Sequence, residues 1–302
     1  MMDYEQTLKE LALRDERIIV MTAENRAPVR SMPQALGDRF IDTGITEQCM
    51  IGAAAGLALR GRIVVAHALA TFLTLRAYEF IRTDLGIGNL PVKLVGFVPG
   101  FLSDANGPTH QAIEDIGILR GIPPLNIFCP ADHQELVVGL PHIVADASPW
   151  YVRYNTRAAI VEHSTEFAIG IAETLSAGSD VAIIVYGMLF QEAWQAKSLL
   201  EARGVGVRFV NLRTVKPLDE NAVITALRTS KLAVTIEDHF LIGGLFSIVA
   251  ELCLRARLAP DVLPLALDNR WFKPGRLDEV IEFAGFTGPQ IAKKILARLD
   301  EA

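Results

Sequence analysis

The sequence has few of the features that mark secreted, membrane-spanning or disulfide-bonded proteins. Its three cysteines, Cys49, Cys129 and Cys253, lie far apart in apolar contexts without CxxC spacing. This pattern predicts buried free thiols in a reducing compartment, not disulfides or metal ligands. The N-terminal residues are acidic and lack the apolar core of a signal peptide. Because the longest apolar runs are near strand length, we expect a cytoplasmic protein without membrane contact.

Positive charge is also scarce. The chain has 29 Lys and Arg against 35 Asp and Glu, a net charge of −6, and no basic run. A nucleic-acid partner is therefore not expected, since binding to a phosphate backbone needs clustered positive charge. The 51% hydrophobic content of the 302 residues instead predicts large buried cores, in about two domains.

Several common catalytic motifs are missing. Gly204-Val-Gly206 is the nearest approach to a dinucleotide fingerprint, but it lies between a helical and a strand-like run and indicates a helix end. The sequence has no Walker A motif, no GxSxG elbow, and no group of His, Cys and carboxylates at metal-ligand spacing. His133, His142 and His163 are isolated and resemble surface histidines with structural roles. No metal ligand is predicted in this chain.

What the chain does contain is a regular alternation of strand-like and helical runs. In the first half, apolar runs at 18–21, 39–42, 63–67, 92–98, 125–129 and 150–154 alternate with helical segments at 3–14, 46–60, 72–87, 110–120 and 132–146. Strands that alternate with helices at this spacing form a mostly parallel sheet covered on both faces. The continuous, β-branched strand runs agree, because such strands are buried on both sides.

A second series of strand-like and helical runs follows a segment that separates it from the first. Residues 156–179 carry no strand-like run, and beyond them strand-like runs at 181–186, 205–210, 232–236 and 262–267 alternate with helical ones. We therefore expect two α/β domains, over residues 1–164 and 165–302, each with a mostly parallel sheet and helices on both faces.

Glu47 is the most informative single residue. It follows a strand-like run and Gly44, and it opens an apolar helical run that offers a carboxylate almost no partner. With Thr46 as the helix cap, Glu47 would simply complement the positive end of the helix. The alternative is a carboxyl group held in an apolar setting to keep or share a proton, as acid–base chemistry requires.

Two further segments follow strands at the carboxyl edge of the predicted sheet, where open α/β sheets place ligand sites. Gly107-Pro-Thr-His-Gln111 ends a long loop, and its His110 is predicted to open the next helix. That histidine would shuttle protons, bind a hydroxyl or merely cap the helix. Phe72, Leu75 and Tyr78 recur every three residues along a helical turn, which indicates either core packing or an aromatic wall.

These segments resemble the corresponding parts of transketolases. Over essentially its whole length the chain is similar to the second half of a transketolase, the pyrimidine-binding domain followed by the C-terminal domain. The motifs that carry the resemblance are, in family order, Gly44-Ile-Thr-Glu47, Thr71-Phe72-Leu73, Gly107-Pro-Thr-His-Gln111, Pro130-Ala-Asp132 and Thr214-Val-Lys-Pro-Leu-Asp219. Deoxyxylulose-phosphate synthases share this architecture, and the motif around Glu47 would also suit the β-subunits of 2-oxoacid dehydrogenases.

The resemblance implies thiamine diphosphate chemistry, in which the cofactor forms a carbanion at C2 and carries a two-carbon ketol unit from a ketose to an aldose. Glu47 would hydrogen-bond N1′ of the aminopyrimidine ring and stabilise its imino tautomer. The side chains that would surround this ring are Ile45, Phe72, Leu75 and Tyr78. Leu75 stands where typical transketolases have a stacking phenylalanine, so that face of the ring would be aliphatic.

The resemblance also implies substrate contacts. His110 would bind a substrate hydroxyl, and Asn106 stands where the family usually has an aspartate that reads the configuration of a donor hydroxyl. Positive charge for a substrate phosphate would come from Arg157 and Arg153, with Arg26 or Arg30 adding charge from the first loop. Val98 and Pro99 replace a His–Asp pair whose histidine contacts phosphate, so the phosphorylation of the substrate is left open.

The GDG…N motif that holds the metal and diphosphate of the cofactor is missing from the sequence. The resemblance therefore implies one subunit of a split transketolase, in an α2β2 heterotetramer whose other chain holds Mg²⁺ and the diphosphate. Residues 52–56, all Gly or Ala, would allow close helix approach at that interface. The alternatives are a subunit of another thiamine enzyme, either deoxyxylulose-phosphate-synthase-like or a 2-oxoacid dehydrogenase, and a non-catalytic regulatory paralogue. In the second domain, Gly243-Gly244 begins a helix that would bind an anion or form a dimer contact.

Overall fold

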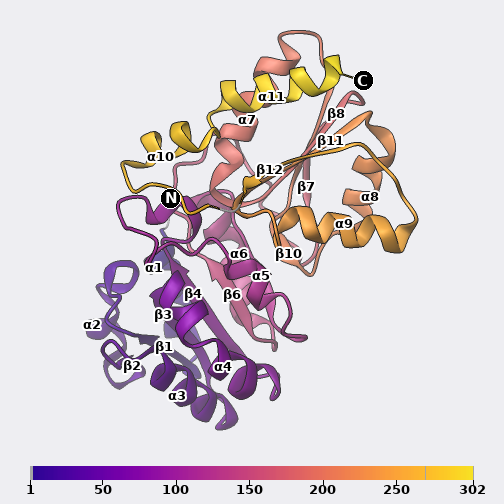
Figure 1. Cartoon of the computed structure of the whole chain (residues 1–302). Helices are drawn as coiled ribbons and strands as arrows, with labels where there is room; N and C mark the ends of the chain where they lie inside the picture. Colours follow the sequence, from indigo (N-terminus) through magenta and orange to yellow (C-terminus); the bar gives the residue numbers. More distant parts are fainter. Residues whose placement is uncertain (1–2, 269, 302) are drawn as a thin grey trace.

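The computed structural model describes residues 3–268 and 270–301 and consists of two α/β units, each built on one sheet (Figure 1). In the first unit the strand order is β10-β5-β6-β4-β3-β1-β2. Its strands are β1 Ile18–Thr22, β2 Phe40–Asp42, β3 Ile63–Leu69, β4 Val92–Phe97, β5 Asn126–Phe128, β6 Trp150–Arg153 and β10 Thr214–Lys216. All of these pair in parallel except β10, which runs antiparallel to β5.

Helices flank this first sheet. They are α1 Tyr4–Arg14, α2 Met32–Leu36, α3 Glu47–Leu59, α4 Tyr78–Phe80, α5 Asp115–Leu119 and α6 His133–Ala145. Two π-helical segments, η3 Phe72–Arg76 and η4 Ile81–Gly86, lie on either side of α4, where a regular helix over 72–87 was predicted. The helix predicted over 110–120 begins only at Asp115, so His110 lies in a turn before it and does not open a helix.

The second unit contains a five-stranded sheet in the order β12-β11-β8-β9-β7. Its strands are β7 Glu173–Ala177, β8 Val181–Val185, β9 Val207–Asn211, β11 Leu232–Phe240 and β12 Val262–Leu267. Its helices are α7 Phe190–Glu201, α8 Glu220–Thr229, α9 Leu245–Ala256, α10 Leu277–Ala284 and α11 Gly288–Asp300. Two mostly parallel sheets flanked by helices confirm the predicted fold class.

Two strands were not predicted, and both lie at sheet edges. β7 is antiparallel to β9 and only partly buried, so its sequence Glu-Thr-Leu-Ser-Ala contains no apolar run. β10 comes from the second half of the chain but pairs with β5 of the first sheet. The prediction that 156–179 holds no strand is therefore wrong. The domain limits 1–164 and 165–302 stay a prediction.

The two units share a hydrophobic core. One cluster of buried side chains continues from Met50 and Leu94 in the first unit to Ile184 and Leu252 in the second. Central strands such as β1 and β8 are buried at every position, as expected for strands covered on both faces. Across 3–268 and 270–301, no helix is long and apolar enough to cross a membrane.

Candidate active site at Glu47

Glu47 is the first residue of α3, at the carboxyl edge of the first sheet. The chain leaves β2 and turns through Gly44, whose φ of 69° favours glycine, before the helix begins. The Glu47 side chain is buried, with 3% of its surface exposed. Thr46 does not cap the helix, because its hydroxyl donates to the carbonyl of Thr43 at 2.8 Å instead. The capping role predicted for Thr46 is therefore wrong.

Glu47 has a partner that the sequence did not predict. Nη1 of Arg76 lies 2.9 Å from Oε2 of Glu47, and the arginine side chain is 40% exposed. The guanidinium group also lies over the ring of Phe72, 4.2 Å from its centroid. The partner comes from η3 and not from the apolar helical run that opens at Glu47. A regular helix would not suggest this pair, because Arg76 ends the π-helical segment η3.

A depression of about 250 Å³ opens beside this ion pair. Its lining residues are Ala23, Glu24, Asn25, Ile45, Glu47, Leu69 and Phe72. The imidazole of His110 meets the Phe72 ring edge-on, at 5.0 Å between centroids. Glu47, Ile45, Phe72 and His110, which lie in three separate segments of the sequence, therefore come together at one edge of the sheet.

Leu75 and Tyr78 are placed differently. Leu75 is 42% exposed, and Tyr78 packs against the largest hydrophobic cluster. Neither is among the described residues that line the depression beside Glu47. A role for either one at the cofactor ring stays a prediction.

The predicted substrate residues are dispersed. Asn106 is exposed in the loop before the Gly107–Gln111 segment. Arg26 pairs with Asp42 at 2.6 Å and remains largely exposed. Arg157 donates to the carbonyl of Met188 at 3.0 Å.

Arg153 does not suit a substrate contact. It is 2% exposed, with Nε 2.9 Å from Asp115 and Nη1 2.6 Å from Asp238. The pair with Asp115 lies within the first unit, and the pair with Asp238 joins β6 of the first sheet to β11 of the second. The structure thus assigns Arg153 to the contact between the two units.

The start of α9, a candidate anion site in the sequence, is already capped from within the chain. The Glu237 carboxylate accepts hydrogen bonds from the backbone N–H groups of Leu245 at 2.6 Å and Phe246 at 2.9 Å. A carboxylate of the protein therefore satisfies the donors that an anionic ligand would need. The anion-binding interpretation of Gly243-Gly244 is not supported.

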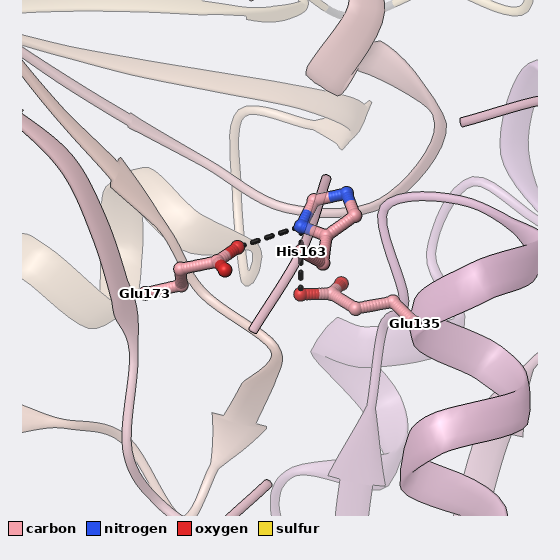
Figure 2. Close-up of side chains that lie close together, drawn as sticks. All are labelled: Glu135, His163 and Glu173. Carbon is pink, nitrogen blue, oxygen red and sulfur yellow. Dashed lines mark hydrogen bonds and ion pairs between the residues drawn. The ribbon is translucent and has the colours of Figure 1, made fainter. Parts of the chain in front are cut away.

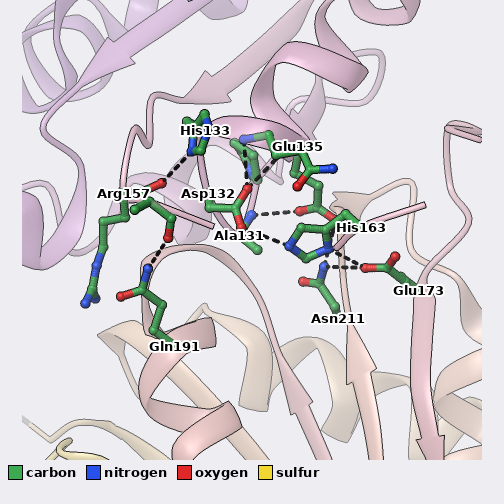
Figure 3. A network of polar contacts seen from close by, with 12 residues as sticks. Ala131, Asp132, His133, Glu135, Arg157, His163, Glu173, Gln191 and Asn211 are labelled. Carbon is green, nitrogen blue, oxygen red and sulfur yellow. Dashed lines mark hydrogen bonds and ion pairs between the residues drawn. The ribbon is translucent and has the colours of Figure 1, made fainter. Parts of the chain in front are cut away.

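One buried polar cluster was missed entirely. His163, expected at the surface, is 2% exposed between the two units. Its Nδ1 lies 2.6 Å from Glu173 and 3.7 Å from Glu135, as Figure 2 shows. Its Nε2 lies 2.9 Å from Asp132, the N-cap of α6, and Figure 3 shows how these contacts continue to neighbouring residues.

The ligand atoms of Glu135, His163 and Glu173 lie within 4.8 Å of one another, a spacing that a metal ion accepts. Two observations favour an ion-pair network instead. Both nitrogens of His163 already face carboxylates, and Arg213 lies 2.8 Å from Glu135 and 3.1 Å from Glu173. Burial lowers the pKa of His163, but hydrogen bonds to Asp132 and Glu173 outweigh it and raise the pKa to about 10. A protonated imidazole supplies the charge that a metal would bring.

The cysteines also differ from expectation in one case. Cys129 and Cys253 are buried free thiols, as predicted, but Cys49 is exposed on α3, two residues after Glu47. On the same outer face, Ala53 and Gly56 are exposed, and a Cβ added at Gly56 would meet no atom within 4 Å. The helix that carries Glu47 therefore presents small side chains to the outside.

Family models identify both units. The model of the transketolase pyrimidine-binding domain matches residues 2–160, and that of the transketolase C-terminal domain matches residues 170–291. The chain belongs to the transketolase family.

Curated relatives of this family member fall into two length classes. A 6-deoxy-6-sulfo-D-fructose transketolase subunit, SqwH, from Clostridium sp. (strain MSTE9) is 34% identical, over 96% of this chain and 91% of that protein. A 1-deoxy-D-xylulose-5-phosphate synthase from Synechococcus sp. (strain JA-2-3B'a(2-13)) is 35% identical, over 96% of this chain and 46% of that protein. The chain thus spans nearly all of the first relative and about half of the second.

One solved structure matches this chain over nearly the whole length of both. It is described as "Split gene transketolase, inactive beta4 tetramer", with a TM-score of 0.87 and 29% identity. The match covers 98% of this chain and 96% of that one. The fold is therefore that of a split transketolase subunit as well as of the family.

Proposed function

We propose that this chain is the pyrimidine-binding and C-terminal subunit of a thiamine-diphosphate-dependent transketolase. The complete enzyme would transfer a two-carbon ketol unit from a ketose to an aldose. The observation that carries the proposal is the buried carboxylate of Glu47, which opens on a depression with apolar walls at the carboxyl edge of the sheet.

The donor set at this depression fits the aminopyrimidine end of the cofactor. No described residue donates a hydrogen bond to Oε1 of Glu47, so this acceptor is free for a ligand in the depression that Glu47 lines. Ile45, Leu69 and Phe72 supply apolar walls of the kind that a flat heteroaromatic ring needs. Glu47 would accept or share the proton at N1′ of the ring.

Thiamine diphosphate, when bound, supplies the nucleophilic carbon on which ketol transfer depends. The residues of this chain would orient its ring through Ile45 and Phe72 and control one proton through Glu47. The imidazole of His110 meets Phe72 edge-on, and from this position it would form a hydrogen bond with a substrate hydroxyl. Asn106 would add a neutral hydrogen bond near the same place.

A partner subunit would hold the diphosphate and Mg²⁺. Support comes from the sequence, which has no GDG motif, and from a relative of similar extent that is named as a transketolase subunit. The exposed face of α3, with Cys49, Ala53 and Gly56, offers a surface for that partner. We propose an α2β2 assembly, because the related split-gene chain forms a β4 tetramer that is described as inactive.

A deoxyxylulose-phosphate-synthase-like subunit is the second candidate. Similarity to a synthase over 96% of this chain favours it. The substrate also needs definition, since the relative from Clostridium is named for a sulfonated sugar. Arg26, which pairs with Asp42 but stays largely exposed, and Arg157 would contribute charge for an anionic substrate group of either kind. Arg153 is buried in two ion pairs and is not proposed for this role.

Reconstitution with the partner subunit tests the proposal. The chain, the partner from a neighbouring reading frame, or both are assayed with thiamine diphosphate, Mg²⁺ and aldose acceptors. Donors are fructose 6-phosphate, 6-deoxy-6-sulfofructose and pyruvate. We expect turnover of a ketose only when both chains are present. Turnover by this chain alone would refute the split enzyme, turnover of pyruvate would favour the synthase, and a complex inert towards every donor would indicate a regulatory paralogue.

A further inference from the structure

Arg76 stands out among the residues near the depression, because the proposed function leaves it without a task. It is the cation that contacts Glu47, and it takes one carboxylate oxygen only. Oε2 accepts its hydrogen bond at 2.9 Å, while Oε1 accepts none from the described residues. The arginine therefore fixes which oxygen remains for a ligand.

Arg76 has a second contact besides Glu47, and its segment is tied to a neighbouring loop. Its guanidinium lies 4.2 Å from the centroid of Phe72, which lines the depression, so the two side chains orient one another. Both belong to η3, a π-helical segment of the type that is frequent at functional sites. Just before it, the hydroxyl of Thr71 donates to the carbonyl of Gln111 at 2.8 Å, which ties this segment to the loop of His110.

The pairing also has an electrostatic consequence. Arginine stays protonated at all relevant pH values, so its guanidinium is a fixed positive charge beside the buried Glu47 side chain. Their charge-assisted hydrogen bond restrains the orientation of Glu47 more strongly than a neutral hydrogen bond would. Partial exposure of Arg76, at 40%, moderates this effect without abolishing it.

We propose that Arg76 is a positioning residue: it directs Oε1 of Glu47 into the depression and keeps the carboxyl group available for proton exchange with the aminopyrimidine. This inference rests on the proposed role of Glu47. It assigns no contact between Arg76 and substrate, and it predicts an effect on the cofactor before any substrate binds.

Exchange of the cofactor C2 proton for deuterium, followed by NMR in the assembled two-chain complex without substrate, tests the inference. We expect Arg76→Met to slow exchange about tenfold, equivalent to about 1.4 kcal/mol. Arg76→Lys should restore most of the rate, because it keeps the charge. Arg82→Met is the matched control, since Arg82 is an exposed arginine on the neighbouring segment η4, and it should change nothing. An Arg76→Met complex with wild-type exchange, or an Arg76→Lys complex as slow as Arg76→Met, would overturn the inference.

Glu47→Gln in the same experiment separates a failure of the proposed function from a failure of the role proposed for Arg76. If Glu47→Gln leaves exchange unchanged, the proposed function itself fails. If it slows exchange while Arg76→Met does not, only the role of Arg76 fails. Should Arg76→Met not assemble, Arg76→Gln replaces it, because glutamine keeps a hydrogen-bond donor without the charge, and its exchange rate decides in the same way.

Discussion

Two of the places where this chain buries carboxylates contrast with one another. At His163, Asp132 and Glu173 take one ring nitrogen each, and Arg213 pairs with Glu135, so each carboxylate has a cationic partner. Among the described residues, Arg76 contacts one oxygen of Glu47, and the other oxygen accepts no hydrogen bond beside a depression. A buried charge that is fully paired supports the structure, whereas one with an accessible acceptor is available to a ligand.

The two environments also differ in what they connect. The His163 cluster joins α6 of the first unit to β7 and the end of β9 in the second (Figure 3). Glu47 and Arg76 both belong to the first unit and lie at its surface edge. The comparison therefore predicts that changes at His163 affect stability and that changes at Glu47 affect activity.

Glu47→Gln should give the largest effect. We expect the turnover of the assembled enzyme to fall about 10²–10⁴-fold, the usual contribution of a general acid–base group. The free energy of unfolding should change by no more than about 1 kcal/mol, because Arg76 is partly exposed and can be solvated. Turnover is measured by ketol transfer, and stability by urea unfolding followed by circular dichroism. Full activity of the variant would show that Glu47 is not needed for turnover, and the predicted difference between the two regions would be wrong.

Arg213→Met should show the opposite pattern. The substitution leaves Glu135 and Glu173 buried without their arginine, which costs about 3–5 kcal/mol of unfolding free energy. Arg17→Met is the control, since the Arg17 side chain is 65% exposed in its pair with Asp15, and an exposed pair contributes at most about 1 kcal/mol. Urea midpoints of both variants measure the difference. Equal midpoints would show that the His163 cluster does not stabilise the contact between the two units.

The pH dependence of stability should single out His163. Its pKa is about 10 in the folded chain, against an ordinary value of 6.5. A raised pKa means that the stabilisation is complete below pH 6.5 and is lost as the pH rises through 10. Urea unfolding from pH 6 to 10 should therefore show a decline of up to about 1.4 kcal/mol per pH unit that His163→Gln removes. If the variant keeps the same decline, His163 is neutral in the folded chain.

Sequence patterns predicted the central strands because burial on both faces leaves its mark in consecutive residues. A strand buried on both faces must be continuously apolar, so β1 and β8 were recognisable. β7 was missed because an edge strand that is only partly covered needs no apolar run. β10 was missed because its three residues are too few to form a pattern, although Thr214 and Val215 are buried. Glu47, Phe72 and His110 were found because they lie in motifs that follow strands, and such ends converge at one edge of a parallel sheet.

The remaining features depend on contacts between distant segments. Arg76 reaches Glu47 because a π-helical segment changes the register of its side chains, and a regular helical period does not reveal that. His163 looked isolated because its partners, Asp132, Glu135 and Glu173, come from other elements that only the fold brings together. Spacing along the chain carries no signal for such a cluster.

The smallest expected effect concerns the reactivity of the cysteine thiols. Cys49 is exposed two residues after Glu47, whereas Cys129 is fully buried and burial raises the pKa of its thiol. A maleimide should therefore modify one thiol in the native chain and all three in urea. Added partner subunit should slow labelling of Cys49 roughly tenfold, because the core of a stable interface excludes solvent. Labelling at an unchanged rate in an active complex would mean that the outer face of α3 stays free, and the partner would then have to reach the Glu47 depression from another side.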